Sequence, residues 1–185
     1  MSYNNNEITN MDQTQIDYIQ VSNNVIDIIS EILDEIVKES ASLDLLSEAE
    51  EEQQTTTSAL IQDFLSKKPP QISINKYLKR FMKYSKPEPS TLIISLIYID
   101  KICENSNLQL TMFNIHRLVF ACLIVAIKYN EDDYYSNEYY AKVGGITLKE
   151  LNLLEYNILI LLDFNVFIDD LVYESYENQI KDYGK

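Results

Sequence analysis

The chain has 185 residues, 46% of them hydrophobic, and a formal net charge of −14. These values predict one soluble globular domain of ordinary size together with an extension. They argue against a membrane span, because the longest apolar run, residues 118–127, holds only ten residues, whereas a helix that crosses a bilayer needs about 20. The first ten residues also lack the basic and apolar segments of an export signal.

The acidic charge lies almost entirely in the N-terminal part. Residues 1–66 carry fourteen Asp/Glu and one Lys, whereas residues 67–185 carry fourteen Lys/Arg and fifteen Asp/Glu. We interpret residues 1–58 as an acidic extension that holds a helix over about 14–39 and a polar linker, SEAEEEQQTTTS, over 47–58. The helix is amphipathic, because five aliphatic side chains fall on one face: Val25, Ile28, Ile29, Ile32 and Ile36. The globular unit is expected to begin near Ala59.

The remaining periodicity is helical throughout. A first helix is expected over 73–85, where the proline-containing KPEP ends it, and a second over about 90–104. A third follows from Asn114 to Tyr129, and its apolar stretch 118–127 predicts a helix surrounded by others. A fourth, short helix should end at Gly144 and Gly145. Thr147-Leu-Lys-Glu150 predicts a capping box that opens a fifth helix, which reaches about residue 164.

Four charged residues interrupt the apolar faces of these helices: Arg80, Asp100, Lys128 and Glu155. Burying an unpaired charge is unfavourable, so these side chains should pair with each other or be covered by a partner. For Arg80 and Asp100 we expect a structural ion pair between two helices. For the other two an ordinary alternative stays open, because Lys128 lies near a helix C-terminus and Glu155 could lie in solvent.

Several segments resemble the cyclin box, and in particular its P/U-type branch, which includes the phosphate-regulating cyclins of yeast. They are ISINKYLKRFMKY, SLIYIDKIC and the run over 114–164, which contains NIHRL, YYSNEYYAKVGG and LNLLE in order. The resemblance implies a single five-helix box over residues 59–167, followed by a helical tail over 168–185. Only about twenty residues follow the fifth helix, which we interpret as too few for a second box of five helices, each of about 11 residues.

The resemblance implies a regulatory subunit that binds and activates a cyclin-dependent kinase by positioning its αC helix. In that family, a lysine at the position of Lys128 and a glutamate at the position of Glu155 bind kinase backbone. Five tyrosines are candidates for the same surface, although packing between helices is an equal alternative for each: Tyr129, Tyr134, Tyr135, Tyr139 and Tyr140. The first helix lacks the Met-Arg-Ala-Ile-Leu pattern with which cell-cycle cyclins dock substrates. Substrate choice therefore cannot be transferred from the cell-cycle cyclins. The choice between a cell-cycle role and a phosphate-signalling role also stays open.

Residues 67–86 carry seven Lys/Arg and no acid. We consider Lys76, Lys79 and Lys83 a possible docking patch for acidic or phosphorylated protein segments. The alternative is a solvated helix face.

Other classes of function are less well supported by the sequence. The chain lacks nucleotide-binding glycine motifs and calcium-loop spacing, and His116 is interpreted as a helix-start residue, so we expect no enzyme activity, no cofactor and no metal. The alternatives are a non-activating scaffold and a nucleic-acid-binding protein of the cyclin fold, although the sequence pI of about 4.4 disfavours nucleic acid as a partner. Cys103 and Cys122 lie in aliphatic runs, which predicts buried thiols and an intracellular location, in the nucleus or cytoplasm.

Overall fold

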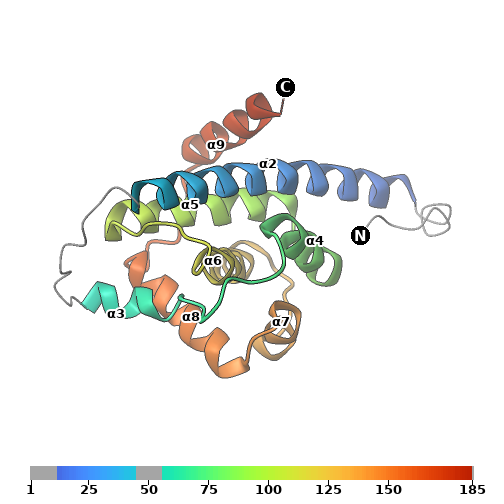
Figure 1. Cartoon of the computed structure of the whole chain (residues 1–185). Helices are drawn as coiled ribbons and strands as arrows, with labels where there is room; N and C mark the ends of the chain where they lie inside the picture. The colour runs from blue at the N-terminus through green and yellow to red at the C-terminus, as the bar shows by residue number, and fades with distance from the viewer. Residues whose placement is uncertain (1–11, 45–55, 185) are drawn as a thin grey trace.

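A computed structural model of the protein describes residues 12–44 and 56–184. Every regular element in these two ranges is an α-helix, so the predicted all-α fold is confirmed (Figure 1). The helices are α2 (Gln13–Asp44), α3 (Thr56–Gln62), α4 (Ile74–Ser85), α5 (Pro89–Ser106), α6 (Ile115–Asn130), α7 (Asn137–Gly144), α8 (Leu148–Leu161) and α9 (Asp170–Tyr183).

The five helices predicted for the box correspond to α4–α8, and the predicted tail contains α9. The helix of the extension runs further at its C-terminal end than expected, as α2. The predicted linker differs from the structure at its C-terminal end, because α3 already begins at Thr56. The rest of that linker, residues 47–55, lies outside the described residues.

Local side-chain bonds explain where several helices begin. The hydroxyl of Ser73 accepts a hydrogen bond from the backbone N–H of Lys76 and so caps α4. The capping box of α8 is confirmed: the Glu150 carboxylate accepts from the Thr147 N–H at 2.9 Å, and the Thr147 hydroxyl accepts from the Glu150 N–H at 3.2 Å. Asn114 precedes α6 as predicted, but its side-chain oxygen accepts from Thr111 in the preceding loop instead of capping the helix.

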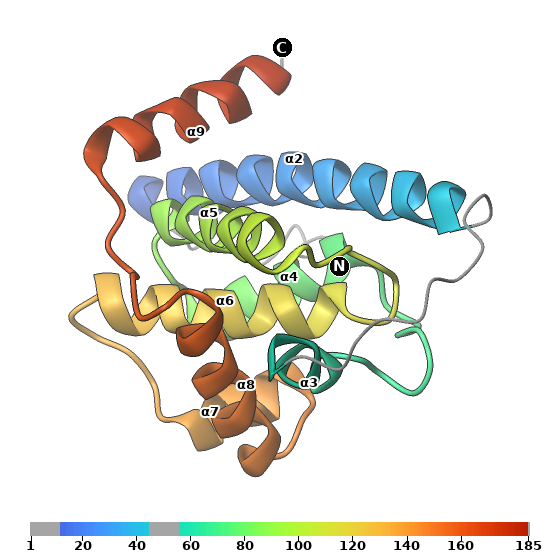
Figure 2. The same cartoon turned by 90° about the vertical axis from the view of Figure 1, so that its left-hand side faces the viewer.

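Helix α6 is the central helix of the domain. It lies between α5 and α8 in both views of the molecule (Figures 1 and 2). All residues from Leu118 to Ile127 are buried, as the unbroken apolar run predicts. Because neighbours surround this helix on all sides, the residues at its C-terminal end are placed where several helices meet.

Helix α2 belongs to the same hydrophobic core as the box. It runs alongside α5 (Figure 1). Of the five predicted apolar residues, Val25, Ile28 and Ile29 are buried, whereas Ile32 and Ile36 are partly buried. An ion pair of 2.5 Å between Asp27 on α2 and Lys79 on α4 also joins these two helices. The N-terminal helix is therefore packed on the box along its apolar face.

The two consecutive glycines at the C-terminal end of α7 serve different steric needs. At Gly144, a Cβ would lie 2.4 Å from a ring carbon of Phe120, so α7 approaches the core more closely than a side chain would allow. At Gly145 the backbone has φ +74°, and nothing lies within 4 Å of a Cβ there. The first glycine is required by packing and the second by the left-handed helix end.

We expect Gly144→Ala to destabilise the fold by about 1–3 kcal/mol, because the Phe120 ring is itself buried and cannot move aside freely. Gly145→Ala should cost about 1 kcal/mol through backbone strain alone. Urea unfolding of both variants measures the difference. Gly145→Asn is the matched test, since asparagine tolerates this conformation and should recover most of the loss. A fully stable Gly144→Ala protein would contradict the packing explanation.

Both cysteines are free thiols in the structure, Cys122 buried and Cys103 partly buried. Burial raises the pKa of Cys103 to about 12 and that of Cys122 well above its ordinary value. Both therefore stay protonated at neutral pH and behave as small apolar groups. Among the described residues, no helix combines the length and the apolar character that a membrane crossing requires.

Candidate functional site

Lys128 and Glu155 form an ion pair at the surface edge where α6 and α8 meet. The Lys128 Nζ donates to Glu155 Oε1 at 2.6 Å. Lys128 stands in the last turn of α6, and Glu155 lies on α8 between the buried Leu154 and Ile158. Their side chains are 26% and 17% exposed, so the pair is partly desolvated but open on one side. The sequence predicted these two residues individually, and the structure brings them together.

A third helix holds the same carboxylate. Asn137, the first residue of α7, donates from Nδ2 to Glu155 Oε2 at 2.7 Å and to the Asn152 side-chain oxygen at 2.7 Å. Both carboxylate oxygens of Glu155 are thus fixed, one by α6 and one by α7. Neither Asn137 nor Asn152 was predicted from the sequence. The only sequence feature that marks Asn137 is its position directly after Ser136, the residue that caps α7.

This arrangement leaves hydrogen-bonding capacity directed to solvent. An ammonium group has three donors, and the described contacts of Lys128 use one. Each oxygen of a carboxylate can accept more than one hydrogen bond, so Glu155 can still accept from further N–H groups. A partner that presents a backbone carbonyl and a backbone N–H side by side could satisfy both residues at one place.

The predicted tyrosines occupy different environments. Tyr129, Tyr134 and Tyr135 are exposed, at 51%, 55% and 47%. Tyr140 is 1% exposed and belongs to the core, so its prediction as a surface residue is wrong. Tyr139 stacks on Tyr135 with ring centroids 4.3 Å apart, and its hydroxyl donates to the backbone carbonyl of Tyr84 at 2.6 Å. Packing within the molecule therefore accounts for part of Tyr139, while Tyr129 and Tyr135 remain available to a partner.

One more aromatic residue joins this surface. Tyr156 follows Glu155 on α8 and is 56% exposed, and Leu153 on the same helix is 43% exposed. Tyr156 was not predicted from the sequence; it lies off the apolar stripe of α8 and faces solvent. An exposed tyrosine thus directly follows each member of the ion pair in sequence, Tyr129 on α6 and Tyr156 on α8, and tyrosine is enriched in protein interfaces.

The predicted ion pair between Arg80 and Asp100 is wrong. Arg80 is exposed on α4, and no ion pair among the described residues includes it or Asp100. The Asp100 carboxylate instead accepts a hydrogen bond of 2.9 Å from the hydroxyl of Tyr176 on α9. Helix α9 occupies the space beside Asp100, and periodicity alone could not show which helix would lie there.

Burial raises the pKa of Asp100 above its ordinary value of 3.8, and the Tyr176 hydrogen bond only partly offsets this effect. A carboxyl group whose pKa is raised in the folded state stabilises the fold while it is protonated. That stabilisation is lost as the pH rises through the folded-state pKa. We therefore expect Asp100→Asn to raise the melting temperature at pH 7. The gain should shrink as the pH falls toward 3.8. A lower melting temperature of the variant at pH 7 would contradict the desolvation argument.

The three lysines predicted as a docking patch are not equivalent. Lys79 is engaged by Asp27 of α2, and that carboxylate also accepts from Asn75. Lys76 and Lys83 are exposed on α4. The charge of Lys79 is therefore partly neutralised within the molecule, and the docking of acidic segments stays a prediction.

Comparisons with known proteins agree with this architecture. The family model described as Cyclin matches residues 23–166, well over half of the chain. It begins within α2, before the box start predicted at Ala59.

Curated relatives carry the same family name. Cyclin-U1-1 of Arabidopsis thaliana is 42% identical over 108 residues, which cover 58% of this chain and 51% of that protein. Cyclin-U3-1 of the same plant is 40% identical over 118 residues, 64% of this chain and 53% of the relative. Cyclin-P3-1 of Oryza sativa subsp. japonica is 36% identical over 112 residues, 60% of this chain and 48% of the relative. The chain spans about half the length of these relatives.

Proposed function

Since this chain belongs to the cyclin family, within its P/U branch, we propose that it is a regulatory subunit that binds and activates a cyclin-dependent protein kinase. The observation that carries the proposal is the Lys128–Glu155 pair, fixed by Asn137 and partly open to solvent. Family membership supports a regulatory role and not an enzymatic one. The proposal adds that the partner is a protein kinase and that the chain activates it.

The proposed mechanism is positional. A protein kinase is active when its β3 lysine pairs with the αC glutamate and its activation loop is ordered. A protein that binds better to this arrangement shifts the kinase toward it. Lys128 donates to backbone carbonyls near the start of the αC helix, and Glu155 accepts from backbone N–H groups there. Because α6, α7 and α8 hold both charges rigidly, little ordering is needed on binding.

The surface around the pair suits such a contact. Tyr129, Tyr135 and Tyr156 each offer a large apolar ring with a polar tip. A stable complex would bury about 1,200–2,000 Å² in total, centred on the ends of α6 and α7 and on the outer face of α8. The exposed rings then exclude water from the charged contact and strengthen it.

The experiment that tests the proposal has two steps. The chain is first used to isolate an associated protein kinase, and the purified kinase is then assayed on a generic protein substrate with and without the chain. The proposal requires phosphoryl transfer to rise when the chain is added. A kinase that binds without activation would support the scaffold alternative. Retention of the chain on a nucleic acid duplex, and not on a kinase, would support the nucleic-acid-binding alternative.

A further inference from the structure

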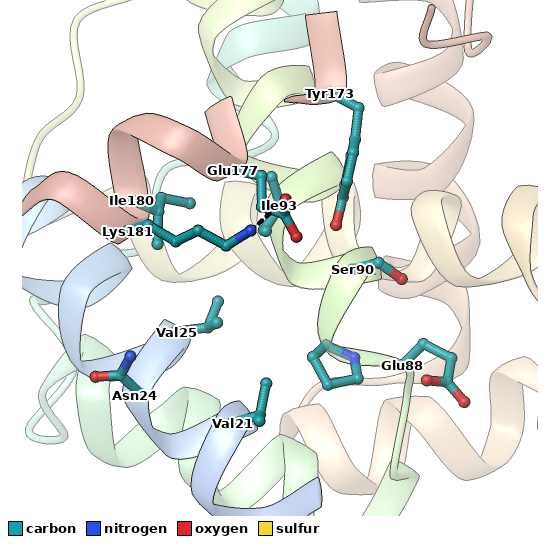
Figure 3. A pocket seen from close by; sticks show the side chains of 11 residues that line it. Val21, Asn24, Val25, Glu88, Ser90, Ile93, Tyr173, Glu177, Ile180 and Lys181 are labelled. Atoms are coloured by element: carbon teal, nitrogen blue, oxygen red, sulfur yellow. Dashed lines mark hydrogen bonds and ion pairs between the residues drawn. The ribbon is translucent and has the colours of Figure 1, made fainter. Parts of the chain in front are cut away.

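A groove lies on the face of the molecule formed by α2, the start of α5 and α9. We call it the α9 groove; its volume is about 370 Å³. Its base is formed by the buried side chains of Val25, Ile93 and Ile180, one from each helix, and Val21 at its mouth is 52% exposed. Figure 3 shows Val21 and Val25 reaching in from α2 and Tyr173 and Glu177 from α9. The lining is thus apolar at the base and polar at the rim.

Hydrogen bonds from α9 to α5 and to α2 hold the walls of the α9 groove in place. The Tyr176 hydroxyl donates to Asp100 on α5, and the Tyr183 hydroxyl donates to Glu35 on α2 at 3.0 Å. Between these two hydrogen bonds, α9 buries only Ile180. The helix is therefore held over α2 and α5 at a few points and does not fill the space between them, which leaves the groove accessible.

The helices that border the α9 groove carry net negative charge, and the charged side chains that line it are two carboxylates, Glu88 and Glu177, and one ammonium, Lys181. Helix α2 carries seven Asp/Glu and one Lys, and α9 carries four Asp/Glu and one Lys. That lysine, Lys181, is held by Glu177 in an ion pair of 2.5 Å within the rim. Glu88, at the N-terminal end of α5, makes no side-chain cap to the helix. An occupant must therefore offset negative charge while it covers apolar surface.

We propose that the α9 groove binds a basic amphipathic segment of a partner protein. Apolar side chains of that segment would contact Val21, Ile93 and Ile180, and flanking Lys or Arg side chains would lie against Glu88 and Glu177 at the rim. This is the helix-in-groove form of recognition, in which apolar anchors give affinity and flanking charges give orientation and rate. The groove uses none of the residues assigned to the kinase contact.

The probe is a fluorescent designed peptide of about 14 residues, or four helical turns, with leucine on one face and lysine elsewhere. Its binding to the full chain is followed by anisotropy at low and physiological salt. Val21→Glu is compared with Leu171→Glu, a residue 75% exposed on α9 that does not line the groove. Both variants add the same negative charge. A difference in peptide affinity between them therefore reports contact with the apolar base of the groove, and not electrostatic attraction to the chain as a whole.

We expect Val21→Glu to weaken binding about tenfold or more, equivalent to about 1.4 kcal/mol, while Leu171→Glu leaves it unchanged or slightly tighter. Glu88→Gln should weaken it less and flatten its salt dependence. Equal binding by both Glu variants, or by a peptide with glutamate in place of lysine, would overturn the proposal. So would sedimentation showing that the chain self-associates through this groove, since a second copy would then be the occupant. Thermal melting confirms that each variant is folded.

Discussion

Replacing either Lys128 or Glu155 by alanine is expected to remove stable kinase binding and activation. Loss of one partner from a desolvated charged contact typically weakens binding by about 2–5 kcal/mol. Folding should change little, because the two side chains are 26% and 17% exposed and a partly exposed pair contributes little to stability. The measurements are thermal melting, kinase co-purification and kinase activity, made in parallel on wild type and variants.

The matched control is Lys142→Ala, which breaks another Lys–Glu ion pair, on α7, whose side chains are 74% and 68% exposed. It should leave melting, binding and activation unchanged. Asn137→Ala keeps both charges and removes one of the two bonds that hold Glu155, so an intermediate loss of binding is expected. Full activation by both charge variants would refute the assignment of the pair, even though membership of the cyclin family would stand.

Phe120→Ala is expected to have the largest effect on stability, a loss of about 3–5 kcal/mol. The ring is 1% exposed at the centre of α6 and contacts Tyr77 and Phe81 edge to face, at centroid distances of 6.1 and 5.7 Å. It also lies against Gly144. Truncation would leave a cavity bordered by α4, α6 and α7 that these rigid neighbours cannot fill. The free energy of urea unfolding measures the loss.

Phe113→Ala provides the control, because this phenylalanine is 41% exposed just before α6. The same truncation there should cost no more than about 1 kcal/mol. Similar losses for the two variants would mean that hydrophobicity in general, and not the packed position of Phe120, determines the effect. A large loss only for Phe120 would also test the packing reason for Gly144, since both residues meet at the same contact.

The sequence by itself determined the described helices of this protein other than α3, which begins within the segment predicted as a linker. The apolar run over 118–127 predicted a fully buried helix, because only surrounding helices can cover all of its sides. Thr147 and Glu150 predicted a helix start, and Gly145 a helix end, because capping bonds and left-handed backbone depend on residues close in sequence. The same local patterns marked Lys128 and Glu155 as charges on apolar faces.

Only the tertiary structure decided which side chains meet. Arg80 and Asp100 both interrupt apolar faces, yet Asp100 meets Tyr176 of α9 and Arg80 faces solvent. Asn137 gave almost no signal in the sequence, yet it fixes Glu155 because α7 packs beside α8. Periodicity gives the face of a helix on which a residue lies, whereas its partner depends on how that helix is oriented against others distant in sequence. Hydrogen bonds and ion pairs depend on distances of a few ångströms between such elements, so they are set by the packing of the whole core.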